Sequence, residues 1–183
     1  LPRAFTRCKR VHAYLDLGGR WLVVDAASWR EAERLTDDLR GLLGSLPIRP
    51  LPTESAPHQV MTEWLAHDRF PGDVEPGEAA VFEDPRMAGA EVRCKRQDLR
   101  SGEIRGHIKA GKRVRQLALC WDGRLNAVID ADLSVKRLKA TDVVERDADD
   151  RESETAAERF DADFAIMSGE LARFLPRLQA WFG

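Results

Sequence analysis

The chain has 183 residues, of which 43% are hydrophobic and 33% are charged, a composition typical of one globular domain or of two small ones. No window approaches 18 uninterrupted apolar residues, which excludes a transmembrane helix, and no basic-then-apolar leader is visible. Three cysteines without a Cys-x-x-Cys pair argue against a disulfide framework and against the common zinc sites. We therefore expect a cytoplasmic protein with no membrane partner.

The net charge is only −2, but the charges are distributed unevenly along the chain. Residues 92–139 hold 13 Lys and Arg against five Asp and Glu, whereas residues 142–163 hold three Arg against ten acidic residues. Two solvated faces would explain this asymmetry, and so would a basic surface that binds a polyanion. The acidic segment leaves a further alternative open, a module that docks a basic protein.

The first segment, residues 1–52, is expected to form a β-β-α-β unit. Two strand-like runs, residues 11–17 and 20–26, meet at a Gly-Gly pair suited to a tight hairpin. Ser28 is placed as a helix N-cap, Glu31 completes a capping box, and apolar residues follow at helical spacing to Gly44. A short extended segment comes next. Four prolines between residues 47 and 57 then favour a domain boundary, because each removes a backbone donor.

Residues 53–183 predict a sheet flanked by helices. Helical patterns lie at residues 60–66 and 101–110, and residues 69–89 read mainly as a loop. Strand patterns occupy residues 80–83, 90–96, 113–121, 124–130 and 133–140, of which the last three form a meander. The fold class is therefore α+β, a remnant β-β-α-β unit followed by an antiparallel sheet with helices.

A second capping box, Thr155 with Glu158, is expected to open a C-terminal helix. Apolar residues follow alternately four and three positions apart over three heptads from Phe160, and Pro176 should kink or divide the helix near Phe174. Such a stripe favours a helix that packs on its own sheet, because most amphipathic helices do only that, and a contact with a second copy of the chain is the alternative. The candidates for a homodimer contact are Phe160, Phe164, Met167 and Leu171.

Enzymatic chemistry has little support in the sequence. Residues 106–113 have the spacing of a phosphate-binding loop, but Arg113 replaces the Ser or Thr that would hold magnesium. No nucleophile motif or metal-ligand spacing is present, so we expect no enzyme, cofactor or metal site. A magnesium-dependent nuclease stays the alternative, because it needs clustered carboxylates near a cation. The loose candidates are Asp84 and Glu91 with Arg93 or Lys95, Asp130 with Asp132, and Asp161 with Asp163.

The basic residues favour contact with phosphates. Arg105, Lys109 and Lys112 recur at i, i+4 and i+7, which predicts one basic helix face. Further Lys and Arg side chains decorate the meander, and no strand interleaves them with aromatic residues that could stack on bases. Phosphate contact of this kind is indifferent to base sequence.

Seven short motifs are spread over essentially all 183 residues. They are LPRAF (1–5), GSLP (44–47), TEW (62–64), KRQDL (95–99), HIKAGK (107–112), KRLK (136–139) and RFDADF (159–164). Their order and spacing resemble the recombination-associated protein RdgC family of proteobacteria. The family usually has two lysines before Gln-Asp-Leu, and here the second is Arg96, which keeps the charge but changes the geometry.

The resemblance implies a nucleoid-associated, non-catalytic protein that binds duplex DNA without marked sequence preference. It further implies a homodimeric ring whose basic hole can encircle a duplex, and restraint of RecA-promoted strand exchange. Because family members run to about three hundred residues, we expect the C-terminal three-fifths of such a protein. Residues 1–52 are then part of a central α/β domain whose other half is missing, and residues 53–183 are a C-terminal, base-like α+β domain.

The motifs and the charge pattern point to the same residues. Arg3, Arg96 and Gln97 lie within motifs and carry donors suited to phosphate oxygens. Phe5 is expected at a domain junction or subunit contact. The candidate DNA-binding residues are Arg3, Lys95, Arg96, Gln97, Arg105, Lys109, Lys112, Lys136, Arg137 and Lys139.

Overall fold

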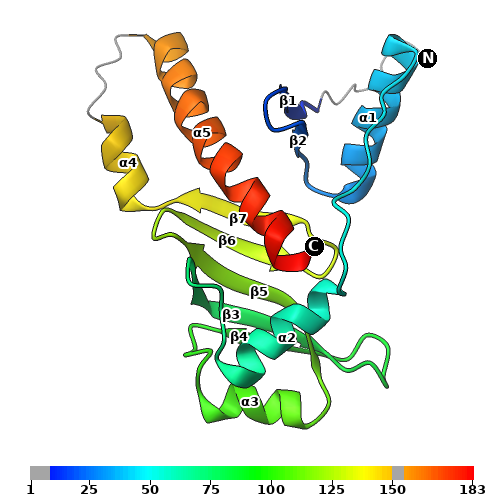
Figure 1. Ribbon diagram of the computed structural model, residues 1–183, viewed down its shortest axis with the longest axis vertical. Helices are drawn as coiled ribbons and strands as arrows, with labels where there is room; N and C mark the ends of the chain where they lie inside the picture. Colours follow the sequence, from blue (N-terminus) through cyan, green and yellow to red (C-terminus); the bar gives the residue numbers. More distant parts are fainter. Residues whose placement is uncertain (1–8, 150–154) are drawn as a thin grey trace, which may run out of the picture. The chain divides into compact units, whose positions relative to one another are not determined.

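The computed structural model describes residues 9–149 and 155–183, and it divides the chain into a first unit, residues 1–50, and a second unit, residues 51–183 (Figure 1). Both units combine helices with antiparallel strands, which confirms the α+β class. The roles expected for the two segments, half of a central domain and a base-like domain, stay predictions.

The first unit consists of a hairpin and one helix. Strands β1 (His12–Asp16) and β2 (Trp21–Asp25) pair antiparallel, and helix α1 (Trp29–Leu43) follows. In the turn, Gly19 N donates to Asp16 Oδ1 at 2.9 Å, and a Cβ on Gly19 would lie 2.5 Å from the other carboxylate oxygen. The left-handed residue of this turn is Arg20 and neither glycine. Residues 45–50 belong to no strand, so the described unit is β-β-α.

The expected capping box of α1 does not form. Ser28 occupies the N-cap, but its side chain makes no capping hydrogen bond. Glu31 instead accepts from Ala27 N at 2.9 Å and pairs with Lys9 at 2.6 Å. At its other end the helix stops at Gly44, whose φ of 74° is left-handed as expected.

The first unit has no buried side chain among its described residues, 9–50. Its helix carries apolar residues on one side, yet none of them is buried. A two-stranded hairpin is marginally stable by itself, and one helix that leaves its apolar side half exposed adds little hydrophobic stabilisation.

The second unit is built on a five-stranded antiparallel sheet with the strand order β4-β3-β5-β6-β7. The strands are β3 (Val74–Glu83), β4 (Glu91–Lys95), β5 (Arg113–Trp121), β6 (Leu125–Asp130) and β7 (Val135–Ala140). The helices are α2 (Pro57–His67), α3 (Gly102–Lys109), α4 (Asp142–Asp149) and α5 (Ala156–Phe182). The expected strand at residues 80–83 was too short, because a bulge lets β3 continue through Pro76 and Gly77.

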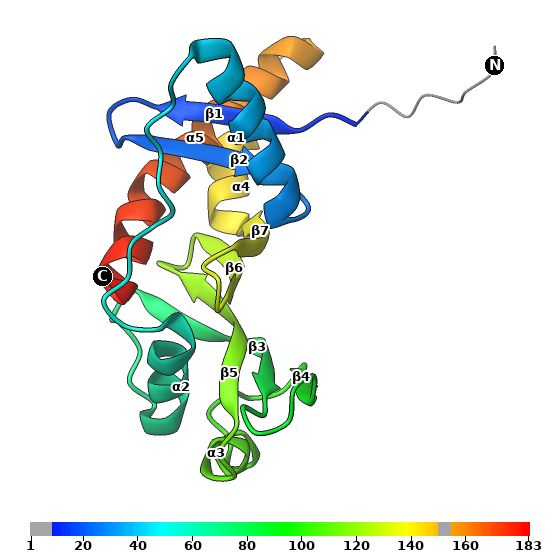
Figure 2. The ribbon, with the colours of Figure 1, turned by 90° about the vertical axis from the view of Figure 1, so that its right-hand side faces the viewer.

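The helices cover one face of this sheet. Phe174 of α5 packs edge-on against Trp121 with ring centroids 5.4 Å apart, and His107 of α3 lies 5.5 Å from Phe82. Thr62 of α2 accepts a hydrogen bond from the β5 backbone. Figure 2 shows the opposite side of β3 and β4 without a helix of the described second unit. We call this side the open face. Its residues by register are Glu75, Ala79, Val81, Glu83, Glu91, Arg93, Lys95, Arg113, Gln116, Ala118, Cys120, Asn126, Val128, Asp130, Lys136 and Lys139, and Arg115 is the extra residue beside Gln116, bonded to Glu91 of this face.

Helix α5 is held against the sheet by a buried ion pair as well as by aromatic packing. Glu170, only 3% exposed, accepts from the Arg124 guanidinium at 2.7 and 3.1 Å and also from Arg173. Burial raises the pKa of Glu170, but the bonds from Arg124 and the charge of Arg173 outweigh it, so this pKa lies below its ordinary value. The carboxylate is therefore ionised at neutral pH.

Helix α5 is continuous through Pro176, so the proline does not divide it. Its capping box is complete, because Thr155 accepts from Glu158 N and Glu158 accepts from Thr155 N. Glu54 N donates to Phe182 O at 3.0 Å, which joins the two ends of the second unit. Within the described part of the chain, no helix is both long and apolar enough to span a bilayer.

Candidate nucleic-acid interface

A bulge in β7 brings two predicted DNA-binding lysines onto the open face. Lys136 pairs with Val128 and Lys139 with Asn126, although the lysines are three positions apart in the chain and their partners only two. In a regular strand, residues three apart point to opposite faces. The extra residue is taken up beside Arg137, whose φ of 52° is left-handed. Alternation in the sequence alone would have placed these lysines on different faces.

A second bulge, in β3, shapes the opposite edge of the sheet. Residues 77–79 lie across from the single residue Ala118, and a Cβ on Gly77 would come within 2.9 Å of the Ala118 Cβ. Only glycine therefore fits there without movement. The chain leaving β4 docks against this bulge, since Gln97 N donates to Glu78 O at 3.2 Å.

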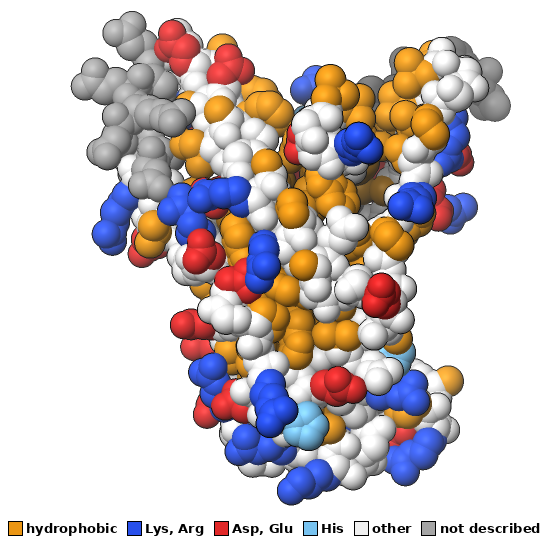
Figure 3. Space-filling model, viewed as in Figure 1, with side chains coloured by type: hydrophobic (Ala, Val, Ile, Leu, Met, Phe, Trp, Pro, Cys, Tyr) orange, Lys and Arg blue, Asp and Glu red, His pale blue; other side chains and the backbone are white. Residues whose placement is uncertain are grey.

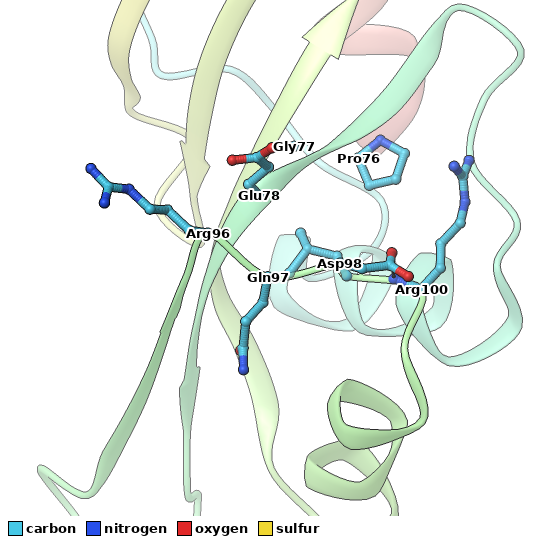
Figure 4. Close-up of a pocket in the computed structure, with 8 residues that line it drawn as sticks. Pro76, Gly77, Glu78, Arg96, Gln97, Asp98 and Arg100 are labelled. Carbon is cyan, nitrogen blue, oxygen red and sulfur yellow. Dashed lines mark hydrogen bonds between the residues drawn. The ribbon is translucent and has the colours of Figure 1, made fainter.

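Between the bulge and the end of β4 lies a shallow pocket of about 300 Å³ (Figure 4). It is lined by Pro76, Gly77, Glu78, Arg96, Gln97, Asp98, Leu99 and Arg100. The Arg96 backbone is left-handed, with a φ of 53°, and its side chain points away from the rest of the pocket. Gln97 Nε2 donates to Glu103 at 3.3 Å, whereas its buried Oε1 has no partner among the described residues. The sequence pattern does not predict this pocket, because Pro76 and Gly77 are typical of a loop and not of a strand.

The predicted DNA-binding residues divide into paired and free cations. Lys136 Nζ lies 2.5 Å from Asp130, a carboxylate that is 4% exposed and also accepts from Gln116. Lys112 lies 3.7 Å from Asp84. Of the eight described cations among the candidates, the other six make no side-chain hydrogen bond or ion pair with any described residue. These free cations are Lys95, Arg96, Arg105, Lys109, Arg137 and Lys139.

The basic helix face is shorter than expected. Helix α3 stops at Lys109 and the chain turns at Gly111, whose φ is 89°, so Lys112 lies beyond the helix. Arg105 and Lys109 remain on α3. Figure 3 shows Lys and Arg side chains gathered over the end of the second unit where α3 lies.

Three of the carboxylates proposed for a nuclease, Asp84, Glu91 and Asp130, pair with cations. A bond from Arg86 lowers the pKa of Asp84 to about 2, and bonds from Arg93 lower the pKa of Glu91. Asp132 bonds to Ser134, two residues along the chain. Across residues 9–149 and 155–183, no three Asp, Glu, His or Cys side chains are grouped as metal ligands. The remaining candidates, Asp161 and Asp163, are exposed on α5.

The residues expected at a homodimer contact differ in exposure. Phe160 and Phe164 stack with their ring centroids 6.4 Å apart and are 66% and 45% exposed. Met167 is half-buried, and Leu171 is buried where α5 packs on its own sheet. Arg3 and Phe5 lie outside the described residues. The interface role of this whole set stays a prediction.

Comparison with known proteins agrees with the motifs. The family model described as "Putative exonuclease, RdgC" matches residues 1–183. The chain is 53% identical over its whole length to the recombination-associated protein RdgC of Halorhodospira halophila and 40% identical to that of Psychromonas ingrahamii, covering 61% of each. It is 42% identical over 178 residues to that of Pseudoalteromonas atlantica, covering 97% of this chain and 59% of the relative.

The chain thus spans about three-fifths of the length of the curated relatives it matches. The match of the family model extends over every residue, and the identity to a full-length relative exceeds one half. From the motifs, the family model and these relatives together, the chain belongs to the RdgC family of recombination-associated proteins.

Proposed function

We propose that this chain binds duplex DNA without sequence preference, through phosphate contacts made by the free cations of its second unit. The observation that carries the proposal is that most of the described candidate cations are free and only Lys112 and Lys136 among them pair with carboxylates. Six Lys and Arg side chains around one sheet have no described acidic partner, so a ligand that neutralises them displaces no internal ion pair. A polyanion gains the release of its counterions on such contact.

The geometry of the sheet supports a duplex as the ligand. Lys95 and Lys139 lie on the two outermost strands, β4 and β7. Four inter-strand spacings separate these strands by roughly 19 Å, which exceeds the ~12 Å width of the major groove. One protein molecule can therefore reach phosphates on both sides of a groove. The open face between the two lysines carries no aromatic side chain for stacking on unpaired bases.

We place this binding in recombination, with restraint of RecA-promoted strand exchange on the nucleoid as the consequence of occupying the duplex. The printed name of the relatives, recombination-associated protein, supports the process. A homodimeric ring is part of the same proposal, and the exposed pair Phe160 and Phe164 is its candidate contact.

The test is fluorescence anisotropy of a labelled random-sequence duplex across a series of salt concentrations. Lys95→Ala combined with Lys139→Ala removes two phosphate contacts, so the log–log salt slope should fall in magnitude by about 1.8. Arg146→Ala, a cation exposed on α4, is the matched control and should leave the slope unchanged. Equal slopes for the double variant and the control would contradict the proposed surface.

The family description as an exonuclease is tested in the same preparation. Linear and supercoiled DNA are incubated with magnesium or with EDTA, using protein that has passed the binding assay. Because cations hold Asp84 and Glu91, we expect the DNA to stay intact. Degradation that EDTA abolishes would establish a nuclease in place of a purely binding function.

A further inference from the structure

We propose that Arg93 and Arg115 form a phosphate-binding site on the open face, and that Glu91 occupies this site when no DNA is bound. The inference rests on the proposed DNA binding and specifies a contact that the free cations do not include. In the sequence Glu91 is a candidate only as a metal ligand. In the structure it accepts hydrogen bonds from two arginines instead.

Two arginines from different strands converge on this one carboxylate. Arg93 of β4 directs Nε and Nη2 to Glu91 Oε2 at 3.1 and 2.7 Å. Arg115 of β5 bonds the other oxygen, Oε1, through Nη1. Strand β3 lies between β4 and β5, and a register shift at Val81 and Phe82 marks Arg115 as the extra residue on its strand. The pair is therefore assembled by the fold rather than by neighbours in sequence.

Both oxygens of Glu91 are thus held by guanidinium groups, which is the arrangement that arginines also offer to phosphate. The arginine side chains remain 66% and 44% exposed, whereas that of Glu91 is 20% exposed. An incoming anion can therefore approach the guanidinium groups from solvent. The bonds from Arg93 keep the pKa of Glu91 below its ordinary value, so the internal occupant is charged at neutral pH.

The charges nearby favour exchange with an anion. Asp84, next to this hairpin, pairs with Arg86 and Lys112. Glu83 of β3 lies across from Glu91 and from Arg113 of β5, so this end of the sheet has three carboxylates and five cations, an excess of two positive charges. A backbone phosphate that bonds Arg93 and Arg115 displaces Glu91 into solvent, and no covalent bond changes. Because Glu91 competes with the phosphate, its charge weakens DNA binding at this point.

The chain offers a matched control for the test. Glu83 of β3 stands directly across from Glu91, and its side chain has no cation partner among the described residues. Glu91→Gln and Glu83→Gln remove the same charge from neighbouring positions, but only the first releases two guanidinium groups. Thermal unfolding of both variants checks that the fold is intact.

Duplex binding is measured by anisotropy against salt for the wild type and both variants. Because no carboxylate then has to be displaced, Glu91→Gln should lower the Kd for the duplex about tenfold more than Glu83→Gln does. The log–log salt slope, which counts the neutralised phosphates, should stay the same in both variants. Equal Kd values for the two variants overturn the proposed phosphate site.

A second measurement separates this inference from the proposed function. Inorganic phosphate is titrated while the Arg Nε–H signals are followed by NMR. The signals of Arg93 and Arg115 should shift in Glu91→Gln and stay in place in Glu83→Gln. Shifts without duplex binding by any variant would refute the proposed function and leave the anion site standing. Duplex binding with equal Kd values for the two variants would refute the phosphate site and leave the proposed function standing.

Discussion

The two units of this chain differ in how they are held together. The buried apolar side chains of the described chain all lie between Met61 and Phe182, in the second unit, which also has two buried carboxylates, Asp130 and Glu170. The first unit forms two paired strands and a 15-residue helix, yet it has no buried side chain among residues 9–50. Secondary structure alone therefore does not make a stable unit. The second unit should fold by itself, while the first needs further apolar surface to cover its helix and hairpin.

The largest expected effect is the difference in free energy of unfolding between a substitution in the core of the second unit and one in the helix of the first unit. Phe174→Ala removes a fully buried ring next to Trp121 and should lower the free energy of unfolding by about 3–5 kcal/mol. Leu39→Ala in α1 removes a side chain that is only half-buried, so the loss should be about 1 kcal/mol or less. Urea unfolding followed by circular dichroism measures both. A similar loss for Leu39→Ala would show that the first unit has a core of its own.

The next effect concerns the buried charge of the second unit. Glu170→Gln removes the charge of the buried carboxylate that accepts from Arg124 and Arg173, and it should cost about 3 kcal/mol at pH 7. The folded pKa of Glu170 is lowered, so its contribution is complete above the unfolded value of about 4.3 and is lost as the pH falls through the folded value. The variant should therefore lose less stability than the wild type between pH 5 and pH 2. Asp163→Asn, exposed on the same helix, is the control, and parallel pH profiles for all three proteins would contradict the assignment.

The smallest effect compares the two capping boxes. Thr155→Ala removes the cap of α5 and should cost about 1 kcal/mol, because both reciprocal bonds are present. Ser28→Ala should change the free energy of unfolding hardly at all, since the Ser28 side chain caps nothing. Thermal unfolding of the two variants measures the difference. Equal losses would mean that Ser28 forms its cap in solution.

Local signals predicted most of the elements, and tertiary contacts decided where the prediction failed. The turn at Asp122 and Gly123, both left-handed, follows from residue types that tolerate positive φ. The sequence pattern predicts too short a strand for β3. Pro76 and Gly77 usually end a strand, and they are accommodated here only because they form a bulge opposite Ala118. The two capping boxes read alike in sequence, and only one of them formed.

The candidate site, too, could be predicted from the sequence only in part. Composition located the basic segment, since that requires only counting. Which cations are free depends on carboxylates distant in sequence, such as Asp84 for Lys112, and no periodicity reveals such a pair. The bulge beside Arg137 likewise decides which lysines share a face, and it arises from pairing with β6.

The place of α5 in the chain has a consequence for synthesis. Helix α5, which covers Trp121 through Phe174, follows every strand of its sheet in the chain. A growing chain therefore exposes the apolar side of the finished sheet to its surroundings until α5 has left the ribosome. During that interval the nascent protein is open to chaperones and to aggregation, and the docking of α5 ends that exposure.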